Sequence, residues 1–311
     1  MENRSQTVTM EFILAGFPES KHIKALLFVF ILLLYLFTLV GNIIFIVTVN
    51  ASPRLHSPMY YFLCHLSLLD LLFSSSAMPK ILADMFYVER RISFTMCMIQ
   101  MHTGLFLGET ECFLLAFMAF DRYVAICLPL HYTVIMSQKR CRNIVVITWL
   151  TSLVMTIFPF VFKPLKFCKG NRIDHFVCEI LPLLELVCAN IPFYETLLYS
   201  LSLLFILVPF SLVCVSYACI LISILKIHSV DGSTKAFSTC ASHVTILVMF
   251  YGTLLPSYLG KYYKHPSNRH KYISIIYGCI TPALNPLIYS LRNNEVKGAV
   301  SKILFRNRGP K

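Results

Sequence analysis

The chain has 311 residues, of which 57% are hydrophobic and 14% are charged. A soluble domain carries about 25% charged and roughly 45–50% apolar residues, so this composition excludes an ordinary water-soluble fold. The formal net charge is +12, a value that raises the question of a nucleic-acid partner. The basic residues, however, are spread over all hydrophilic connections and form no basic helix, so we expect solvated loops and lipid headgroup contacts instead.

Seven apolar stretches are each long enough to cross a hydrocarbon layer about 30 Å thick, which takes about 20 helical residues. Backbone polar groups find no water inside a bilayer, so the stretches are predicted to be helices; they lack the alternation of β-barrel strands. The expected spans are 25–49, 58–79, 97–121, 143–162, 197–226, 237–260 and 272–291.

These spans divide the chain into three parts. Residues 1–24 are an N-terminal segment, residues 25–292 form the transmembrane domain, and residues 293–311 are a tail. In the tail, Val296, Val300 and Leu304 recur at helical spacing opposite basic residues, which predicts a short amphipathic helix along the headgroups.

The orientation does not follow from the basic residues, which divide almost evenly between the two sides of the membrane. Asn3 begins an Asn-Arg-Ser acceptor for glycosylation on the N-terminal segment. Four cysteines lie on the same side, as expected for two disulfides in an oxidising compartment, namely Cys97, Cys168, Cys178 and Cys188. Both features predict an extracellular N-terminus and, with an odd number of spans, a cytoplasmic C-terminus.

Three carboxyl groups lie within predicted spans, where ionisable side chains are costly and are candidates for function. They belong to Asp70, Glu109 and Glu111. Residues 109 and 111 are about 200° apart on a helix, so their side chains point in different directions. One of them could join Asp70 around a sodium ion, because hard cations prefer oxygen ligands. The spacing leaves open the alternative of protonated carboxyls bonded to neighbouring helices.

Two motifs mark the predicted inner ends of the third and seventh spans. Asp121-Arg122-Tyr123 places an acid beside a base, an arrangement that alone also fits an interfacial anchor. In the seventh span, Pro286 removes one helical hydrogen bond and kinks the helix, and Asn285 is expected to bond to the freed backbone. This indicates a hinge, although proline is common in membrane helices.

Taken together, the motifs resemble the rhodopsin-like G-protein-coupled receptors, and closely the tetrapod-type (class II) branch of the odorant receptor family. Phe120 stands where that family usually has tyrosine, and Phe250-Tyr251-Gly252 replaces the tryptophan-proline switch of most rhodopsin-like receptors. The resemblance covers nearly the whole chain and rests on Gly41-Asn42, 58–63, 118–127, 129–132, 216–217, 235–243 and 282–293.

The resemblance implies a rhodopsin-like seven-helix bundle and a receptor, not an enzyme, in the plasma membrane. Such a receptor binds small volatile ligands and activates a stimulatory, olfactory-type G protein that raises cyclic AMP. It also implies the disulfides Cys97–Cys178 and Cys168–Cys188, and it pairs Glu111 with Asp70 at a sodium site. No other cofactor is expected.

The same resemblance implies which residues couple to the G protein and which contact the ligand. Coupling to the G protein is assigned to Asp121, Arg122, Tyr123, Tyr217, Asn285, Pro286 and Tyr289. The ligand is expected to contact Gly104, Leu105, Gly108, Glu109, Cys112, Ser202, Phe205, Tyr251, Leu255, Tyr258 and Gly278. Glu109 is not a signature of the family, which makes it a candidate for ligand specificity; ordinary helix packing is the alternative for each of these residues.

Two rival interpretations remain. A transporter or channel would also contain intramembrane acids, but seven spans do not divide into paired repeats with matching broken helices. A receptor for peptides or amines would share the fold, but the missing sixth-helix motif and the short loop near 227–235 argue against it.

Overall fold

A computed structural model describes residues 11–16, 20–87, 89–162, 164–188, 191–226, 230–259, 268–291 and 294–305. The predicted glycosylation site Asn3 lies outside these residues.

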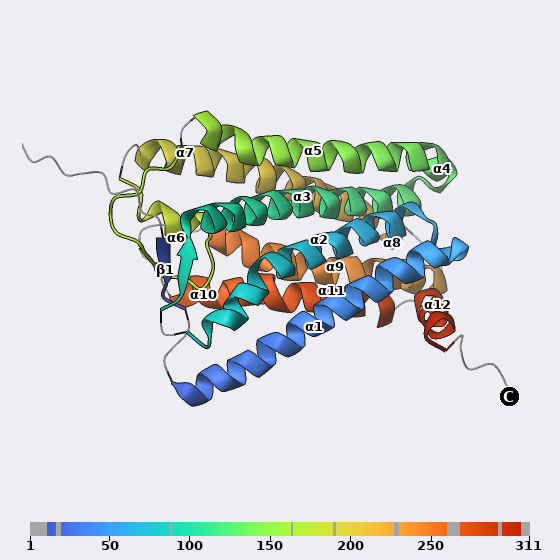
Figure 1. Cartoon of the computed structure of the whole chain (residues 1–311). Helices are drawn as coiled ribbons and strands as arrows, with labels where there is room; N and C mark the ends of the chain where they lie inside the picture. The colour runs from blue at the N-terminus through green and yellow to red at the C-terminus, as the bar shows by residue number, and fades with distance from the viewer. Residues whose placement is uncertain are drawn as a thin grey trace, which may run out of the picture.

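The described residues form the predicted bundle of seven membrane-crossing helices (Figure 1). The first four crossings are the single helices α1 (Lys21–Ala51), α2 (Pro58–Asp84), α3 (Phe94–Cys127) and α5 (Gln138–Phe162). The sixth crossing is also a single helix, α9 (Val230–Leu259). Most are longer than the predicted spans, because the helices continue past the apolar stretches.

The fifth and seventh crossings are each interrupted by one π-helical turn. The fifth consists of α7 (Ile191–Ser202), the π-helix η3 (Leu203–Leu207) and α8 (Val208–Leu225). The seventh consists of α10 (Asn268–Ile275), the π-helix η5 (Ile276–Ile280) and α11 (Thr281–Leu291). π-Helical turns are rare in proteins, and those that occur are often found at functional sites. The apolar pattern of the sequence does not predict them.

The outer faces of the bundle are apolar, as a hydrocarbon solvent requires. Among the described residues, six helices are long and apolar enough to cross a membrane, and Ile273–Tyr289 is a shorter apolar helix. In α1, Leu26 and Leu33 are 73% and 60% exposed, and in α5 Val161 is 68% exposed. These side chains would not be stable against water in such number, whereas lipid covers them at no cost.

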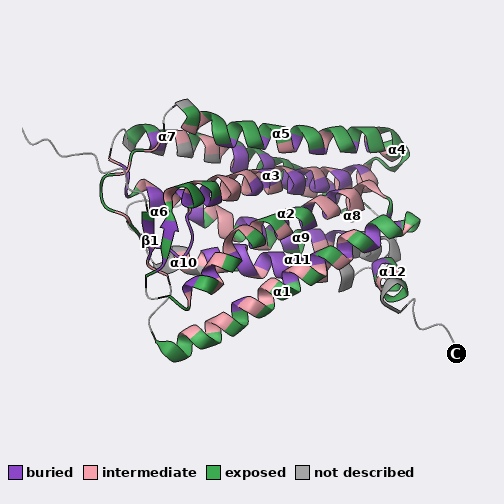
Figure 2. Cartoon of the chain, viewed as in Figure 1, coloured by how far each residue is buried: buried purple, intermediate pink, exposed green. Residues whose placement is uncertain are grey.

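Helix α3 runs through the middle of the bundle and carries much of its core (Figure 2). It packs against α2, α5, α8 and α9. Its side chains Leu114, Leu115, Met118 and Ala119 are fully buried within the main apolar cluster.

A three-stranded sheet covers one end of the bundle, which we call the sheet end. Its strands are β1 (Glu11–Leu14), β2 (Arg91–Ser93) and β3 (Arg172–Ile173), in the order β2-β1-β3. β1 pairs antiparallel with β2 and parallel with β3. Residues 11–14 of the N-terminal segment, for which the sequence predicts no strand, form the central strand, with Phe12 and Leu14 buried.

The connection after β1 depends on a glycine. Gly16 has a φ of +65°, and a Cβ built on it would lie 2.3 Å from a guanidinium nitrogen of Arg90. The same side chain donates a hydrogen bond to the carbonyl oxygen of Ala15. Only glycine fits this left-handed and crowded position without strain.

The opposite end of the bundle, which we call the tail end, holds the chain's last helix, α12 (Asn294–Phe305). It lies across the end of the bundle rather than continuing the seventh crossing, with Val296 buried and Lys297 exposed. The short helices η1 (Pro53–Leu55), η2 (Pro129–His131) and α4 (Tyr132–Ile135) belong to the connections at the same end.

Pro286 in α11 has no N–H, so the carbonyl of Pro282, one turn earlier, lacks its helical donor. The side-chain amide of Asn42 in α1 donates to that carbonyl at 3.1 Å. The prediction that Asn285 fills this role is wrong, because the Asn285 amide donates to Asp70 instead. Gly41 allows the approach, because a Cβ there would lie 2.9 Å from the Pro286 ring.

Candidate functional site

Two adjoining hollows lie between the helices toward the sheet end. The first lobe lies between α3, α5, the fifth crossing and α9, with an empty volume of about 750 Å³ that includes space open to solvent. The second lobe lies between α2, α3, α9 and the seventh crossing, with a corresponding volume of about 1030 Å³. Both are lined by Gly104, Leu105, Gly108, Ile180 and Leu254, so they form one site with two compartments.

Two glycines of α3 open the space between the lobes. Gly104 and Gly108 lie one turn apart and therefore on the same face of the helix. A Cβ built on either would meet no atom within 4 Å. The absent side chains therefore contribute volume to the site rather than a close helix contact.

The first lobe is apolar except at one end. Its walls include Met155, Phe160, Leu197 and Phe205. The exception is the carboxyl group of Glu109, which accepts a hydrogen bond of 3.0 Å from the hydroxyl of Thr156 in α5. A lobe of this kind suits a ligand with an apolar body and one polar group.

Glu111 lies in the other lobe, together with Asp70. The two glutamates of α3 thus face different compartments, as their spacing on the helix predicted. Asn285 binds both oxygens of Asp70 through its side-chain nitrogen, at 3.1 and 2.9 Å. Asp70 is only 2% exposed, so this carboxyl group is removed from lipid and from bulk water.

Several oxygen atoms near Asp70 have no hydrogen-bond partner among the described residues. They include the hydroxyls of Ser67 and Ser74, which flank Asp70 on one face of α2, and the amide oxygen of Asn285. Buried polar atoms without partners cost free energy, so they indicate a missing water or ion. Within the described chain, no three His, Cys, Asp or Glu side chains form a metal cluster.

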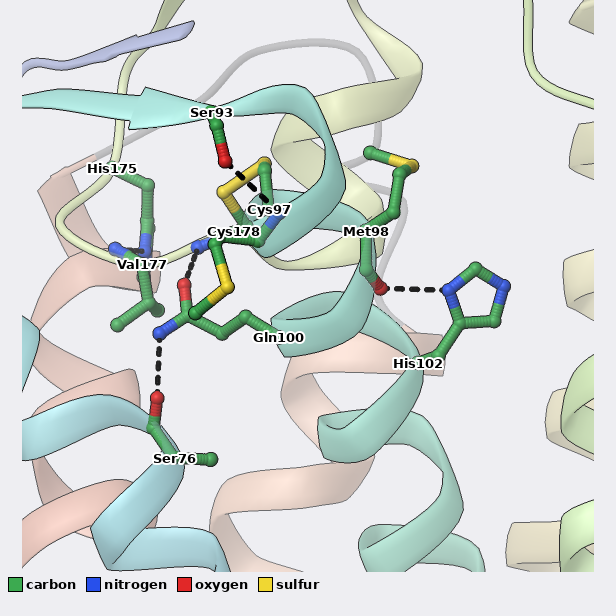
Figure 3. Close-up of a disulfide and its surroundings, with 10 residues drawn as sticks. Ser76, Ser93, Cys97, Met98, Gln100, His102, His175, Val177 and Cys178 are labelled. Atoms are coloured by element: carbon green, nitrogen blue, oxygen red, sulfur yellow. Dashed lines mark hydrogen bonds between the residues drawn. A yellow bond between two sulfur atoms is a disulfide. The ribbon is translucent and has the colours of Figure 1, made fainter. Parts of the chain in front are cut away.

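A disulfide fixes the roof of the site (Figure 3). Cys97 at the start of α3 is joined to Cys178 in the long loop. Below the bridge, Gln100 donates to the backbone oxygen of Ser76 at 2.9 Å and accepts from the N–H of Cys178 at 2.8 Å. One side chain therefore connects α2, α3 and the loop.

The second disulfide joins Cys168 to Cys188 within the long loop. Both bridges are those that the family resemblance implied. Helix α6 (Ile180–Leu184) lies between the paired segments, and Ile180 reaches both lobes of the site.

A polar network closes the second lobe at the sheet end. The carboxyl group of Glu179 accepts hydrogen bonds from Tyr277 at 2.5 Å and from Ser274 at 3.4 Å. His175 is buried and contacts the Ser274 hydroxyl at 3.2 Å. Nearby, Lys271 pairs with Asp174 at 2.5 Å. Only the contacts between the loop and the seventh crossing reveal this network.

The structure brings together many of the predicted ligand-lining residues. Gly104, Leu105, Gly108, Glu109, Cys112 and Phe205 line the first lobe, and Gly278 lines the second. The side chains of Ser202 and Tyr258 are outside the described part of the chain.

Tyr251 and Leu255 are placed elsewhere. They line an apolar hollow between α8 and α9 on the outer side of the bundle. The reason is helical register, since Phe250 and Leu254 occupy the face of α9 that looks into the site. The Tyr251 hydroxyl still donates to the Cys112 carbonyl, at 3.5 Å.

At the tail end, the side chain of Arg122 pairs with that of Asp121 at 3.0 Å. Asp121 is fully buried and also accepts a 2.8 Å hydrogen bond from Tyr132 in α4. Burial, together with the neighbouring Asp121 carboxylate, raises the pKa of Tyr132 above its usual value. Tyr217 of α8 contacts His243 of α9 at 2.8 Å, so the fifth and sixth crossings are joined beside the ion pair.

The remaining predicted coupling residues lie near these pairs or on the seventh crossing. Tyr123 is half-buried and packs its ring against Phe120 at a centroid distance of 6.0 Å. Tyr289 is buried, and its ring lies 5.4 Å from that of Phe45.

A seven-helix membrane bundle with an internal site at one end and a buried acid–base pair at the other is an architecture shared by transmembrane receptors. The family model described as olfactory receptor matches residues 31–307. The chain is 42% identical to human olfactory receptor 2G3 over 96% of its length and 97% of the relative's. It is 45% identical to mouse olfactory receptor 5G29, over 100% and 99% of the two chains.

The chain therefore belongs to the olfactory receptor family. Members of this family are G-protein-coupled receptors in the plasma membrane and are not enzymes. An odorant and a G protein are the partners that the family implies.

Proposed function

We propose that the protein binds a small volatile odorant within the two-lobed site and activates a stimulatory, olfactory-type G protein that raises cyclic AMP. The observation that carries the proposal is the site itself. Its two lobes lie between the helices, their linings are largely apolar, and a disulfide-linked loop covers them. Sites for small ligands are concave and mostly apolar, with few polar groups.

The proposed orientation places the sheet end outside the cell and the tail end in the cytoplasm. The two disulfides at the sheet end support it, because such bonds persist in oxidising compartments. A glycan on Asn3 would agree with this orientation. Glycosidase treatment of the receptor from intact cells tests it: a mass shift lost in Asn3→Gln supports it, and accessibility of the C-terminus outside the cell contradicts it.

Ligand binding is proposed to favour a conformation in which the tail end of α9 moves outward from the bundle. A ligand shifts such an equilibrium only by its difference in affinity for the two states. The Asp121–Arg122 pair and the Tyr217–His243 contact hold the resting arrangement. Activation would release Arg122 toward Tyr217 and the G protein.

The coupling step is tested by Arg122→Ala in cells that express an olfactory-type stimulatory G protein. Wild-type receptor should raise cyclic AMP with some member of a broad odorant panel. Arg122→Ala should abolish the response at equal surface expression, while Arg140→Ala, an exposed arginine at the tail end, should retain it. A full response from Arg122→Ala, or an ion current without G protein, would contradict the proposal.

Glu109 is proposed to contact the polar group of the odorant. Glu109→Gln keeps the shape and the Thr156 partner but removes the acidic proton and the charge. The order of agonist potencies should change, by roughly ten-fold for ligands that bond to the carboxyl, since hydrogen bonds to charged groups are worth about 1.5–3 kcal/mol. An unchanged order across the panel would assign Glu109 to packing.

Asp70 and Glu111 are proposed to hold a sodium ion with the oxygens of Ser67, Ser74 and Asn285. The unpartnered oxygens around Asp70 fit an ion that prefers oxygen ligands. A bound cation would offset the cost of the buried carboxylates and stabilise the resting bundle. Sodium, compared with potassium, should raise the melting temperature of the purified receptor, and Asp70→Asn should remove that difference. Equal stabilisation of the variant would refute the site.

A further inference from the structure

The described linings of the two lobes contain acidic side chains and no basic ones. Four carboxyl groups line them, from Glu109 in the first lobe and from Asp70, Glu111 and Glu179 in the second. No Lys, Arg or His side chain is among the described residues of either lining. Electrostatic complementarity therefore favours a ligand with a positive charge and disfavours one with a negative charge.

The three carboxyl groups of the second lobe already have partners or an assigned ion. The Asn285 amide donates to Asp70, and Glu111 shares the proposed sodium site with Asp70. Two hydroxyl groups of the seventh crossing donate to Glu179. None of these three carboxyl groups needs a ligand to complete its hydrogen bonds.

Glu109 differs, because one of its two oxygens is available to a ligand. Its Oε2 accepts the 3.0 Å hydrogen bond from Thr156. Within the described chain its Oε1 accepts no hydrogen bond, and the carboxyl group is in no ion pair. A carboxylate inside a membrane protein is costly unless a cation lies beside it. The described residues of the first lobe supply no such cation, so the ligand is its available source.

Aromatic side chains add to the surroundings that suit a cation. Phe160 of α5, Tyr194 of α7 and Phe205 of η3 line the first lobe together with Glu109. The face of an aromatic ring carries partial negative charge and attracts an ammonium group within about 6 Å. The Tyr194 hydroxyl donates to the backbone oxygen of Pro164 at 3.0 Å, which holds that ring beside the lobe.

We propose that the first lobe selects volatile amines, with the ammonium group bonded to Oε1 of Glu109 and the hydrocarbon part against the apolar walls. The inference rests on the proposed odorant function and narrows it to one chemical class. The ammonium group donates to the carboxylate, so the pair carries no net charge within the membrane. A carboxylic acid of the same skeleton would place two acidic groups together, and an alcohol would bring a hydrogen bond without the charge. A volatile alkylamine is an odorant, so the family assignment is unchanged.

The experiment compares ligands that differ only in their polar group, namely hexylamine, hexanol and hexanoic acid. Saturable thermal stabilisation of the purified full-length receptor measures their binding without a G protein. Cyclic AMP in cells that express the receptor measures coupling. The same comparison with butyl and octyl chains finds the length that fits the lobe.

Two variants test the role of Glu109. Glu109→Gln keeps the shape of the side chain and removes the charge, whereas Glu109→Asp keeps the charge on a shorter side chain. The matched control is Glu185→Gln, which removes an exposed acidic side chain next to Leu184 of the lining but outside the lobe. Retained stabilisation by the alcohol shows that each variant is folded.

The amine should bind the wild type at least about ten-fold more tightly than the alcohol, because a hydrogen bond between two charged groups is worth that factor. The acid should neither bind nor activate. Glu109→Gln should bring the amine to the level of the alcohol, and Glu109→Asp should keep part of the preference. Glu185→Gln should keep all of it.

Three results would overturn the proposal. Absence of stabilisation by every amine of the series would show that the lobe does not take this class. Equal losses of amine binding in Glu109→Gln and Glu185→Gln would show that diffuse charge attracts the ligand. Equal dependence of alcohol and amine binding on Glu109 would show a protonated carboxyl that donates to neutral ligands.

Failure of the odorant function has a different signature. Amine binding that Glu109→Gln removes, without any cyclic AMP response, would support the selectivity of the lobe and contradict the proposed coupling. Cyclic AMP responses to neutral odorants, without binding of any amine, would refute the selectivity and leave the odorant function in place.

Discussion

The hydrogen bond between Asn42 and the carbonyl of Pro282 predicts that substitutions at Asn42 in α1 and at Pro286 in α11 have coupled effects on stability. Asn42 is fully buried, and its amide donates to Thr38 within α1 and to Pro282 in α11. Pro286 is the reason that the Pro282 carbonyl needs this donor. Asn42→Leu keeps the volume of the side chain and leaves that carbonyl without its partner.

The cost follows from the burial of the orphaned group. A buried acceptor without a donor costs about 1–3 kcal/mol, whereas the bond of Asn42 to its own helix is local and contributes less. Each kcal/mol lowers the melting temperature of a chain of 150–250 residues by roughly 2–4 °C. We expect Asn42→Leu to lower the melting temperature of the purified receptor by several degrees.

The test becomes decisive when Asn42→Leu is also made in the Pro286→Ala variant. In Pro286→Ala the residue at 286 regains an N–H, which can bond to the carbonyl of Pro282 as in a regular helix. Asn42→Leu should therefore cost much less in that background, with a coupling of about 1 kcal/mol or more between the two sites. Asn50→Leu is the control, because Asn50 makes the same bond within α1 but is exposed.

The assay is thermal unfolding of the four proteins of the cycle in one detergent, with surface expression as a second readout. Equal losses from Asn42→Leu in both backgrounds would refute the assignment of Asn42 to the freed carbonyl. So would a loss in Asn50→Leu as large as that in Asn42→Leu.

Three further predictions concern stability and can be checked by the same thermal assay. Gly41→Val should destabilise by about 1–3 kcal/mol, because its Cβ would lie 2.9 Å from Pro286, and Pro286→Ala should relieve much of this loss. Cys97→Ala should cost more than Cys168→Ala, since their bridges close loops of 81 and 20 residues, worth about 4.5 and about 3.3 kcal/mol in the chain-entropy model; the reverse order would contradict that reasoning. Gly16→Ala should reduce folding yield, because the position has a positive φ and faces an arginine side chain, while Gly170→Ala, at an uncrowded positive φ, should cost less.

The sequence was sufficient for the features that depend on local periodicity. Apolar length alone predicts the crossings, and the angle between residues 109 and 111 predicts that their carboxyls enter different compartments, as they do. The family resemblance supplied both disulfide pairings, which spacing alone does not determine.

Features that depend on contacts between distant segments could not be predicted. The partner of the Pro282 carbonyl lies 240 residues away, so no local pattern distinguishes Asn42 from Asn285 as its donor. Thr156 enters the site only because α5 packs beside α3. The sequence also does not determine how α9 is rotated about its axis, and that rotation turns Phe250 rather than Tyr251 toward the site.

The position of β1 in the middle of its sheet has a consequence for biosynthesis. The strand leaves the ribosome first, but its two neighbours follow α2 and α5 along the chain. One edge of β1 can therefore pair with β2 only after the first two crossings have been made, and its other edge can pair with β3 only after the first four. Completion of the sheet therefore requires that the first four crossings have been made, and deletion of residues 11–14 would leave β2 and β3 without the strand that joins them at the sheet end.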